Sequence, residues 1–305
     1  MNGMMRIPLG SILAAAFLAF ADVAKADLKE GIDAYVSGNY PAALREFTPL
    51  AEKGNAEAQY KLGLMHVEGK GVPQDYQVAM SWYRKAAEQG HAEAQNCLGA
   101  MYAEGKGVPQ NERVAISWYR KAAEQENIPA QFNLGVMYAN GRGVPQDFKA
   151  AAGWFRKAAE RGSWGAQTNL GIMYEKGLGV PQDYQAAISW YRKAAEKGIA
   201  GAQNAIGAMY GKGLGVPRDY QTAMSWYRKA AEQGYAIAQN SLGFMYINGQ
   251  GVPADLVQAH TWFSLDAALG NEDAKQNKKL AEARMTADQI ASAEKLARDW
   301  SEKRK

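Results

Sequence analysis

Few side chains in this sequence are spaced for catalysis. Ser292 and Lys295 match the pattern S-x-x-K, the nucleophile motif of penicillin-recognising enzymes. The companion motifs S-D-N and K-T-G do not occur in the sequence. The pair falls on a predicted surface helix. We therefore expect a solvated serine and lysine there rather than a catalytic centre.

A glycine-rich stretch, Gly211-Lys212-Gly213-Leu214-Gly215, is a candidate for phosphate binding. It lacks the preceding strand that a phosphate loop or dinucleotide fold needs. We interpret it as one of six links between helices. Arg-Lys pairs such as Arg84-Lys85 recur along the chain, and we expect them on a solvated helix face.

Metal and thiol chemistry are not predicted. Cys97 is the one cysteine, so no internal disulfide can form. His66, His91 and His260 are scattered and form no metal-binding spacing. We expect His66 to be a packed or capping side chain and Cys97 to be a small, half-buried one. No catalytic residue, metal site or cofactor is assigned.

Charge and composition exclude two further classes. The 305 residues are 47% hydrophobic and 22% charged, which is ample for a folded core. The net charge is +4, the two signs are mixed, and no run of five basic residues occurs. Such a balance gives no reason to expect a nucleic-acid partner.

The start of the chain differs from the rest. Arg6 supplies a positive region, Leu9 to Phe20 carry no charge, and Ala24-Lys25-Ala26 has the A-x-A form of a cleavage site. This pattern predicts a secretory signal peptide over residues 1–26. The alternative is an uncleaved membrane anchor, although the apolar run is short for one. We expect export, most simply to the periplasm, with secretion or surface display as alternatives.

The dominant feature is a repeat of 36 residues. It is marked by Gly-Val-Pro at 71–73, 107–109, 143–145, 179–181, 215–217 and 251–253, by Trp82, Trp118, Trp154, Trp190, Trp226 and Trp262, and by Gln59, Gln95, Gln131, Gln167, Gln203 and Gln239. A fixed period of this size is typical of stacked repeat architectures.

Each unit contains two helical patterns. In the second unit, spacings of three and four residues predict a first helix from about Ala92 to Glu104, ended by Gly105 in a left-handed conformation. The second helix of each unit begins after a residue that can cap it. These residues are Asp75, Asn111, Asp147, Asp183, Asp219 and Asp255. Its Trp–Tyr pair is expected to fill the space toward the next repeat. Glu126 replaces the glycine that ends most second helices, so we expect that turn to be built differently.

The unit A-x-A-Q-x-x-L-G-x-M-Y-x-x-G-x-G-V-P-x-D-x-x-x-A-x-x-W-Y-R-K-A-A-E-x-G resembles the Sel-one-like repeat, a relative of the tetratricopeptide repeat. The resemblance covers residues 55–270. It implies an all-α fold, a right-handed α-solenoid of tandem helix-turn-helix repeats. Residues 27–54 resemble a degenerate tetratricopeptide-like hairpin. Residues 271–305 are expected to form C-terminal capping helices, the last capped by Thr286, with Ile290, Ala293 and Leu296–Ala297 buried.

The resemblance also implies partner binding in a concave groove lined by first helices. Two positions per repeat, which vary while the packing residues do not, should face it. The candidates are Tyr60, Asn96, Phe132, Thr168, Asn204 and Asn240, and then Leu64, Ala100, Val136, Ile172, Ala208 and Phe244. Ile247 is added as an apolar anchor, and Trp164 as either an interface anchor or a local plug. Some of these residues could instead pack only between successive first helices.

The function expected is a non-enzymatic protein-interaction scaffold of the bacterial cell envelope, possessing no small-molecule cofactor. Its partners would be other proteins, of unspecified identity, and the sequence does not fix its oligomeric state. The alternatives are a purely architectural envelope protein and a β-lactam- or peptidoglycan-related enzyme or binder. The last is motivated by S-x-x-K and by cysteine-rich relatives linked to β-lactam binding, whose paired cysteines are absent here.

Overall fold

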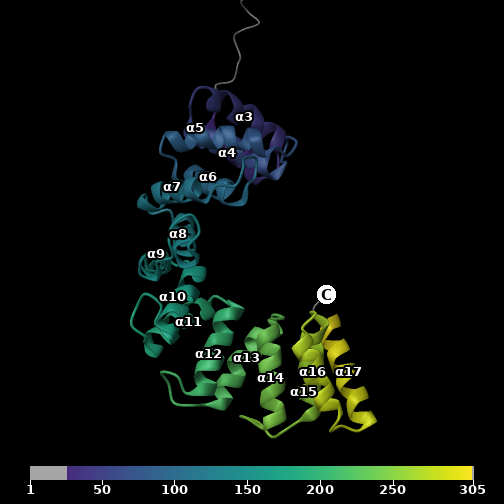
Figure 1. Ribbon diagram of the computed structural model, residues 1–305. Helices are drawn as coiled ribbons and strands as arrows, with labels where there is room; N and C mark the ends of the chain where they lie inside the picture. The colour runs from purple at the N-terminus through teal and green to yellow at the C-terminus, as the bar shows by residue number, and fades with distance from the viewer. Residues whose placement is uncertain (1–25, 304–305) are drawn as a thin grey trace, which may run out of the picture. The chain divides into compact units, whose positions relative to one another are not determined.

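The computed structural model describes residues 26–303, which form sixteen α-helices and no strand (Figure 1). The predicted signal peptide lies almost wholly outside these residues. The helices are α2 (Leu28–Val36), α3 (Tyr40–Glu52), α4 (Ala56–Glu68), α5 (Tyr76–Glu88), α6 (Ala92–Glu104), α7 (Glu112–Glu124), α8 (Ile128–Asn140), α9 (Phe148–Glu160), α10 (Trp164–Lys176), α11 (Tyr184–Glu196), α12 (Ala200–Lys212), α13 (Tyr220–Glu232), α14 (Ala236–Asn248), α15 (Leu256–Ala268), α16 (Glu272–Glu282) and α17 (Ala287–Glu302). The predicted all-α repeat fold is confirmed.

The chain divides into two compact units, Met1–Asn127 and Ile128–Lys305. In the first unit, the described helices run from α2 to α7; the second contains α8 to α17. Within each unit, consecutive helices up to α16 pack as neighbours along the chain, which is the arrangement of a solenoid, and α17 packs on α15. No helix of the described part is long and apolar enough to cross a membrane.

Local sequence sets where each helix starts and stops. The Asp75 side chain accepts hydrogen bonds from the backbone N–H groups of Gln77 and Val78, which caps α5. The other five predicted N-caps do the same for α7, α9, α11, α13 and α15. At the end of α4, Gly69 takes a φ of 67°, and the N–H of Asp75 then donates to the carbonyl of His66 at 3.0 Å. The Gly-Val-Pro link is therefore a closed, hydrogen-bonded loop between the two helices.

The glycine that recurs in all six first helices is explained by close packing inside a helix pair. A Cβ added at Gly63 would lie 2.5 Å from the ring of Tyr83 on α5. The same relationship joins Gly99 to Tyr119, Gly135 to Phe155, Gly171 to Tyr191, Gly207 to Tyr227 and Gly243 to Phe263. The glycine lets an aromatic ring lie directly on the helix backbone.

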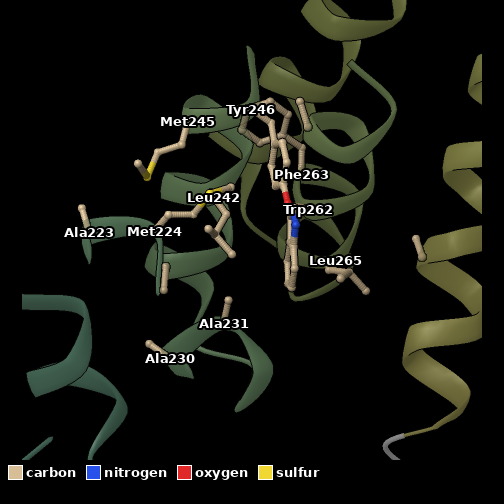
Figure 2. Packing of buried hydrophobic residues seen from close by; sticks show 13 residues of the cluster. Ala223, Met224, Ala230, Ala231, Leu242, Met245, Tyr246, Trp262, Phe263 and Leu265 are labelled. Atoms are coloured by element: carbon tan, nitrogen blue, oxygen red, sulfur yellow. The ribbon is translucent and has the colours of Figure 1, made fainter. Parts of the chain in front are cut away.

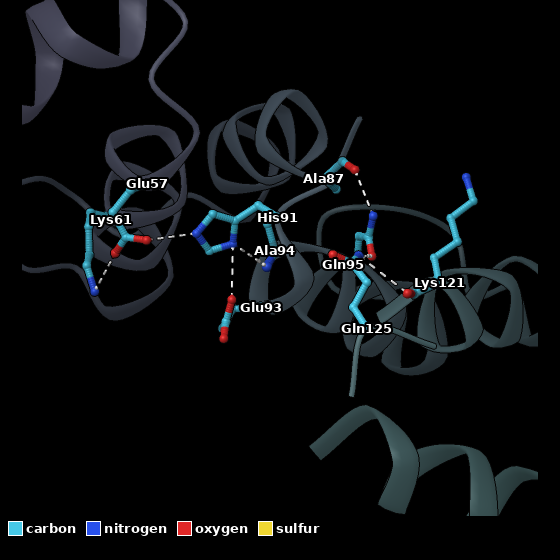
Figure 3. A network of polar contacts seen from close by, with 9 residues as sticks. All are labelled: Glu57, Lys61, Ala87, His91, Glu93, Ala94, Gln95, Lys121 and Gln125. Carbon is cyan, nitrogen blue, oxygen red and sulfur yellow. Dashed lines mark hydrogen bonds and ion pairs between the residues drawn. The ribbon is translucent and has the colours of Figure 1, made fainter. Parts of the chain in front are cut away.

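The recurring glutamine connects one repeat to the next (Figure 3). Gln95 on α6 is buried, and its Nε2 donates to the carbonyl of Ala87 on α5 at 3.0 Å. Its Oε1 accepts a hydrogen bond of 2.8 Å from Nε2 of Gln125. Buried amides must be hydrogen-bonded to avoid a desolvation penalty. The glutamine thus satisfies a carbonyl at the end of the preceding second helix.

The C-terminal end is closed by two helices that lack the repeat motifs. Figure 2 shows the cluster that α13, α14 and α15 form, with Phe263 fully buried. On α15, His260 is also fully buried, and its Nε2 lies 2.9 Å from Oε1 of Glu282 on α16. Thr286 caps α17 in a reciprocal capping box, as predicted. Ala293 and Ala297 are buried, but Leu296, expected to be buried, is 41% exposed.

Three further sequence predictions are wrong. Tyr83 does pack with the following helix α6, whereas Trp82 packs in the cluster formed by α3 and α4 on the preceding side. Gly211 and Lys212 belong to the last turn of α12, so the link begins only at Gly213. The first error assigned a direction that side-chain packing decides, and the second placed the start of the link before the left-handed glycine, Gly213, that ends the helix.

The third error concerns Glu126. Its φ is 64°, the left-handed conformation that the glycines at this position adopt elsewhere. The N–H of Glu126 donates to Ala123, and that of Asn127 donates to Ala122, as the corresponding groups do after α5. The turn therefore has the usual backbone. A glutamate tolerates it at a cost of about 1–2 kcal/mol.

Candidate functional site

Most predicted groove positions keep part of their surface accessible. Half-buried are Tyr60, Leu64, Asn96, Ala100, Phe132, Val136, Thr168, Ile172, Asn204, Ala208, Asn240 and Ile247. Phe244 is 43% exposed and Trp164 is 57% exposed. The contacts around these residues differ between the two units, and each unit is described by itself below.

In the first unit, Tyr60 packs against His91, whose polar contacts are drawn in Figure 3. Its ring stacks on His91 with 4.9 Å between centroids. The Nε2 of His91 lies 2.8 Å from Oε2 of Glu57, and its Nδ1 accepts from the N–H of Ala94 at 3.3 Å, which caps α6. Burial raises the pKa of Tyr60 to about 12. Tyr60 therefore serves packing here, and its groove role stays a prediction.

In the second unit, the predicted groove residues Val136 and Ile172 help to line a small pocket of about 150 Å³ between α8 and α10. We call it the apolar pocket. Its lining is Val136, Ala139, Asn140, Phe148, Phe155, Asn169, Ile172, Met173 and Leu178. No charged side chain is among them. The ring of Phe155, one of these lining residues, lies 5.8 Å from that of Phe132, centroid to centroid.

A second pocket lies at the equivalent position two repeats later, between α12 and α14. We call it the lysine pocket. Its volume is about 290 Å³, and its lining is Ala208, Gly211, Lys212, Tyr220, Tyr227, Ser241, Phe244, Met245 and Gln250. Every residue but the methionine differs from its counterpart in the apolar pocket. Equivalent helices thus form a neutral pocket in one repeat and a larger pocket with a lysine two repeats later.

The repeat between them shows the same position filled. Glu175 on α10 occupies the place of Gly211, and the hydroxyl of Tyr191 donates to its Oε2 at 2.6 Å. Burial, and secondarily this hydrogen bond, raises the pKa of Tyr191 above its usual range. A carboxylate therefore satisfies the buried phenol in this repeat.

Trp164 forms a separate pocket at the start of the second unit. This pocket, of about 330 Å³, is lined by Ile128, Pro129, Phe132, Arg161, Gly162, Ser163, Trp164 and Gly165. The indole lies beside the Phe132 side chain, and 57% of it is exposed. Both readings of this tryptophan stay open, because an exposed ring can cover an apolar pocket and still contact a partner.

The polar groove candidates have individual environments. Oδ1 of Asn240 accepts from Nδ2 of Asn277 on α16 at 3.0 Å. The hydroxyl of Thr168 donates to the carbonyl of Trp164 in its own helix. Oδ1 of Asn204 is buried without a hydrogen-bond partner. Asn240 is thus engaged by the C-terminal helices, whereas Asn204 retains an unused acceptor.

The candidates for chemistry are accounted for by local structure. Ser292 is exposed on α17, and its hydroxyl donates to the carbonyl of Asp288 at 2.8 Å. Cys97 is half-buried as expected, and burial raises the pKa of its thiol to about 11. His66 is half-buried in the last turn of α4. Among residues 26–303, no group of three or more His, Cys, Asp or Glu side chains is placed to hold a metal ion.

Sequence reasoning found Ala208 and Phe244 but missed Gly211, Lys212, Tyr227, Ser241 and Gln250. A usable signal existed at position 211. The equivalent residues are Val67, Ala103, Ala139, Glu175 and Ile247, so glycine occurs once in six repeats. The glycine at 211 matters because it lies beside Tyr227 on the next helix. Comparing position 211 alone between repeats does not reveal that neighbour.

Comparison with known proteins gives a consistent picture. The family model for the Sel1 repeat matches residues 56–91, 92–127, 128–163, 164–199, 200–235 and 236–271. No match was found among curated proteins.

Among solved structures, a Sel1 repeat protein from Oxalobacter formigenes is 34% identical, with 77% of this chain and 94% of that chain covered and a TM-score of 0.71. A protective antigen of uropathogenic Escherichia coli strains, described as displaying an SLR fold, is 28% identical. It covers 95% of this chain and 94% of its own at a TM-score of 0.38.

Proposed function

Because this chain belongs to the Sel1 repeat family, whose members generally mediate protein–protein interactions, we propose that it is a non-enzymatic scaffold. It binds segments of partner proteins along the face that the first helices of its repeats present. The scaffold acts outside the cytoplasm, most simply in the periplasm, after removal of residues 1–26.

One observation carries the binding proposal. The apolar pocket and the lysine pocket occupy equivalent positions, yet nearly all of their lining differs. The glycines that let each helix pair pack closely, such as Gly135 and Gly207, are the same in all six repeats. Packing requires uniformity, whereas recognition of a particular segment requires distinct pockets.

Partner capture tests the proposed surface. The affinity-tagged full chain would be expressed with its own N-terminal segment, and retained envelope proteins identified by mass spectrometry. The double variant Val136→Ser/Ile172→Ser alters the apolar pocket. The matched control, Arg192→Ala/Glu196→Ala, alters exposed residues of the second helix α11. Circular dichroism would show that both variants are folded.

We expect partners retained by the wild type and by the control to be lost from the pocket variant. Equal retention by all three proteins would show that the first-helix face is not the binding surface. If the wild type retained no protein above background, the scaffold proposal itself would fail.

Export is tested separately. The N-terminal residue of the protein purified from its native host is expected to be Asp27, and the protein is expected in the periplasmic fraction. A chain that keeps Met1, or one found in the cytoplasmic fraction, would contradict the export proposal.

A further inference from the structure

The lysine pocket is larger than its equivalent and contains a cation, which the apolar pocket does not. Ala208 replaces Val136 and Gly211 replaces Ala139, which enlarges the cavity from about 150 to about 290 Å³. Lys212 replaces an asparagine, Tyr227 a phenylalanine and Gln250 a leucine, all of which add hydrogen-bond donors. The pocket contains one cation and no aspartate or glutamate. These changes favour an anionic occupant.

Gly211 leaves free space at the edge of the pocket. A Cβ at this position would meet only the Cβ of Ala223, at 3.7 Å, so the space beyond it is open. Tyr227 is the residue uncovered as a result. Its five equivalents, Tyr83, Tyr119, Phe155, Tyr191 and Phe263, are all buried, and Tyr227 is partly exposed.

The neighbour of the Tyr227 hydroxyl is a neutral side chain, Ser241 on α14, which lines the same pocket. The Ser241 hydroxyl donates its own proton to the carbonyl of Ile237 at 2.8 Å. A charged acceptor forms a stronger hydrogen bond to a phenol than a neutral hydroxyl does. A carboxylate entering the pocket would therefore be a better acceptor for the Tyr227 hydroxyl than the Ser241 side chain.

The preceding repeat shows this interaction within the chain. There the hydroxyl of Tyr191 donates to the Glu175 carboxylate at 2.6 Å. Tyr227 and Gly211 lie at the equivalent positions. The lysine pocket thus has the tyrosine of a tyrosine–carboxylate pair, lacks the carboxylate, and has Lys212 beside the vacant position.

We propose that the lysine pocket binds the carboxylate side chain of a glutamate or aspartate presented by a partner protein segment. Lys212 supplies the opposite charge, Tyr227 donates a hydrogen bond, and Gln250 offers an amide donor. Phe244 and Met245 form the apolar wall against the aliphatic part of the side chain. This inference rests on the proposed function and specifies the chemistry of the partner.

Blocked pentapeptides provide a direct probe. One has a central glutamate among alanines, the second a central glutamine, and the third only alanines with a free C-terminal carboxylate. Binding is followed by the 13C-methyl resonance of Met245, which is labelled in Figure 2 and assigned through Met245→Leu. We expect a saturable shift with the glutamate peptide, and binding weaker by at least about tenfold with each of the others.

Two variants test the assignment of residues. Gly211→Glu rebuilds the internal pair of the preceding repeat, so it should abolish binding of the glutamate peptide while leaving the fold intact. Lys212→Gln should weaken binding by about tenfold. The matched control is Lys176→Gln, the equivalent lysine in the repeat where Glu175 fills the position. It should bind as the wild type does.

Equal binding of the glutamine peptide, tighter binding of the peptide with a free C-terminus, or unchanged binding by Lys212→Gln would each overturn the inference. No shift with any peptide would overturn it as well. The capture experiment above uses the separate apolar pocket. Partner loss in that experiment, combined with failure of the glutamate peptide, would leave the scaffold proposal standing and remove only this inference.

Discussion

The hydroxyl of Tyr191 donates a hydrogen bond to the carboxylate of Glu175 across 2.6 Å, from the second helix of a repeat to its first. One repeat later, glycine stands at the equivalent of Glu175, and the tyrosine is partly exposed. The exchange of Glu175 for glycine between repeats therefore accompanies the change from an internal contact to an open pocket. Neighbouring repeats thus differ locally while the helices keep the same order and packing.

The first prediction compares the two tyrosines. Tyr191→Phe removes a buried hydrogen bond to a carboxylate and should destabilise the protein by about 1–2 kcal/mol. Tyr227→Phe removes the hydroxyl of a partly exposed ring beside a neutral serine, so its cost should stay below about 0.5 kcal/mol. Urea unfolding followed by circular dichroism measures both. An equal loss in the two variants would show that the Glu175 contact adds nothing.

The second prediction concerns two helical glycines. A Cβ at Gly171 would lie 2.6 Å from the ring of Tyr191, so Gly171→Ala should destabilise the protein by about 1–3 kcal/mol. At Gly153, on α9, no atom lies within 4 Å of the added Cβ. Gly153→Ala should therefore stabilise the protein by about 0.5–1 kcal/mol through higher helix propensity. Thermal unfolding should give shifts of opposite sign, and shifts of the same sign would contradict the packing described above.

The third prediction tests the buried glutamine. Gln95→Met keeps the volume but leaves the carbonyl of Ala87 and the amide of Gln125 without this partner. We expect a loss of about 1–3 kcal/mol, because buried polar groups that lose a hydrogen bond keep their desolvation cost. The control Gln77→Met changes an exposed residue of α5 and should stay within about 0.5 kcal/mol. Chemical denaturation distinguishes the two, and a tolerated Gln95→Met would make the recurring glutamine dispensable.

The fourth prediction is a pH dependence at the C-terminal end. The hydrogen bond from His260 holds the pKa of Glu282 below its usual value of 4.5, with Lys278 adding to the effect and burial opposing it. A carboxyl whose pKa is lower in the folded state stabilises that state above its unfolded pKa. This contribution is lost as the pH falls through the folded pKa.

Glu282→Gln should therefore lower the melting temperature at pH 7, and the difference from the wild type should shrink below pH 4.5. Glu272→Gln, on the exposed side of the same helix, is the control and should change little at either pH. Melting curves at several pH values provide the measurement. A difference that grows on acidification would show the opposite sign of coupling.

The sequence alone determined the repeat, its period and most helix ends. Asp75 and its equivalents cap their helices, and Gly105 adopts a left-handed φ of 72°, because both effects act within a few residues of backbone. Thr286 likewise begins the last helix as predicted. The family followed from the same regularity, since six copies agree in spacing and identity.

Only the tertiary structure decided which departures from the repeat matter. Gly211 creates a pocket because Tyr227 and Phe244 come from other helices and approach the same space. The side on which Trp82 packs and the exposure of Leu296 were likewise not fixed by helical periodicity. These features depend on how side-chain volumes from successive helices fill or leave a shared space, and that sum is formed only when the helices are packed.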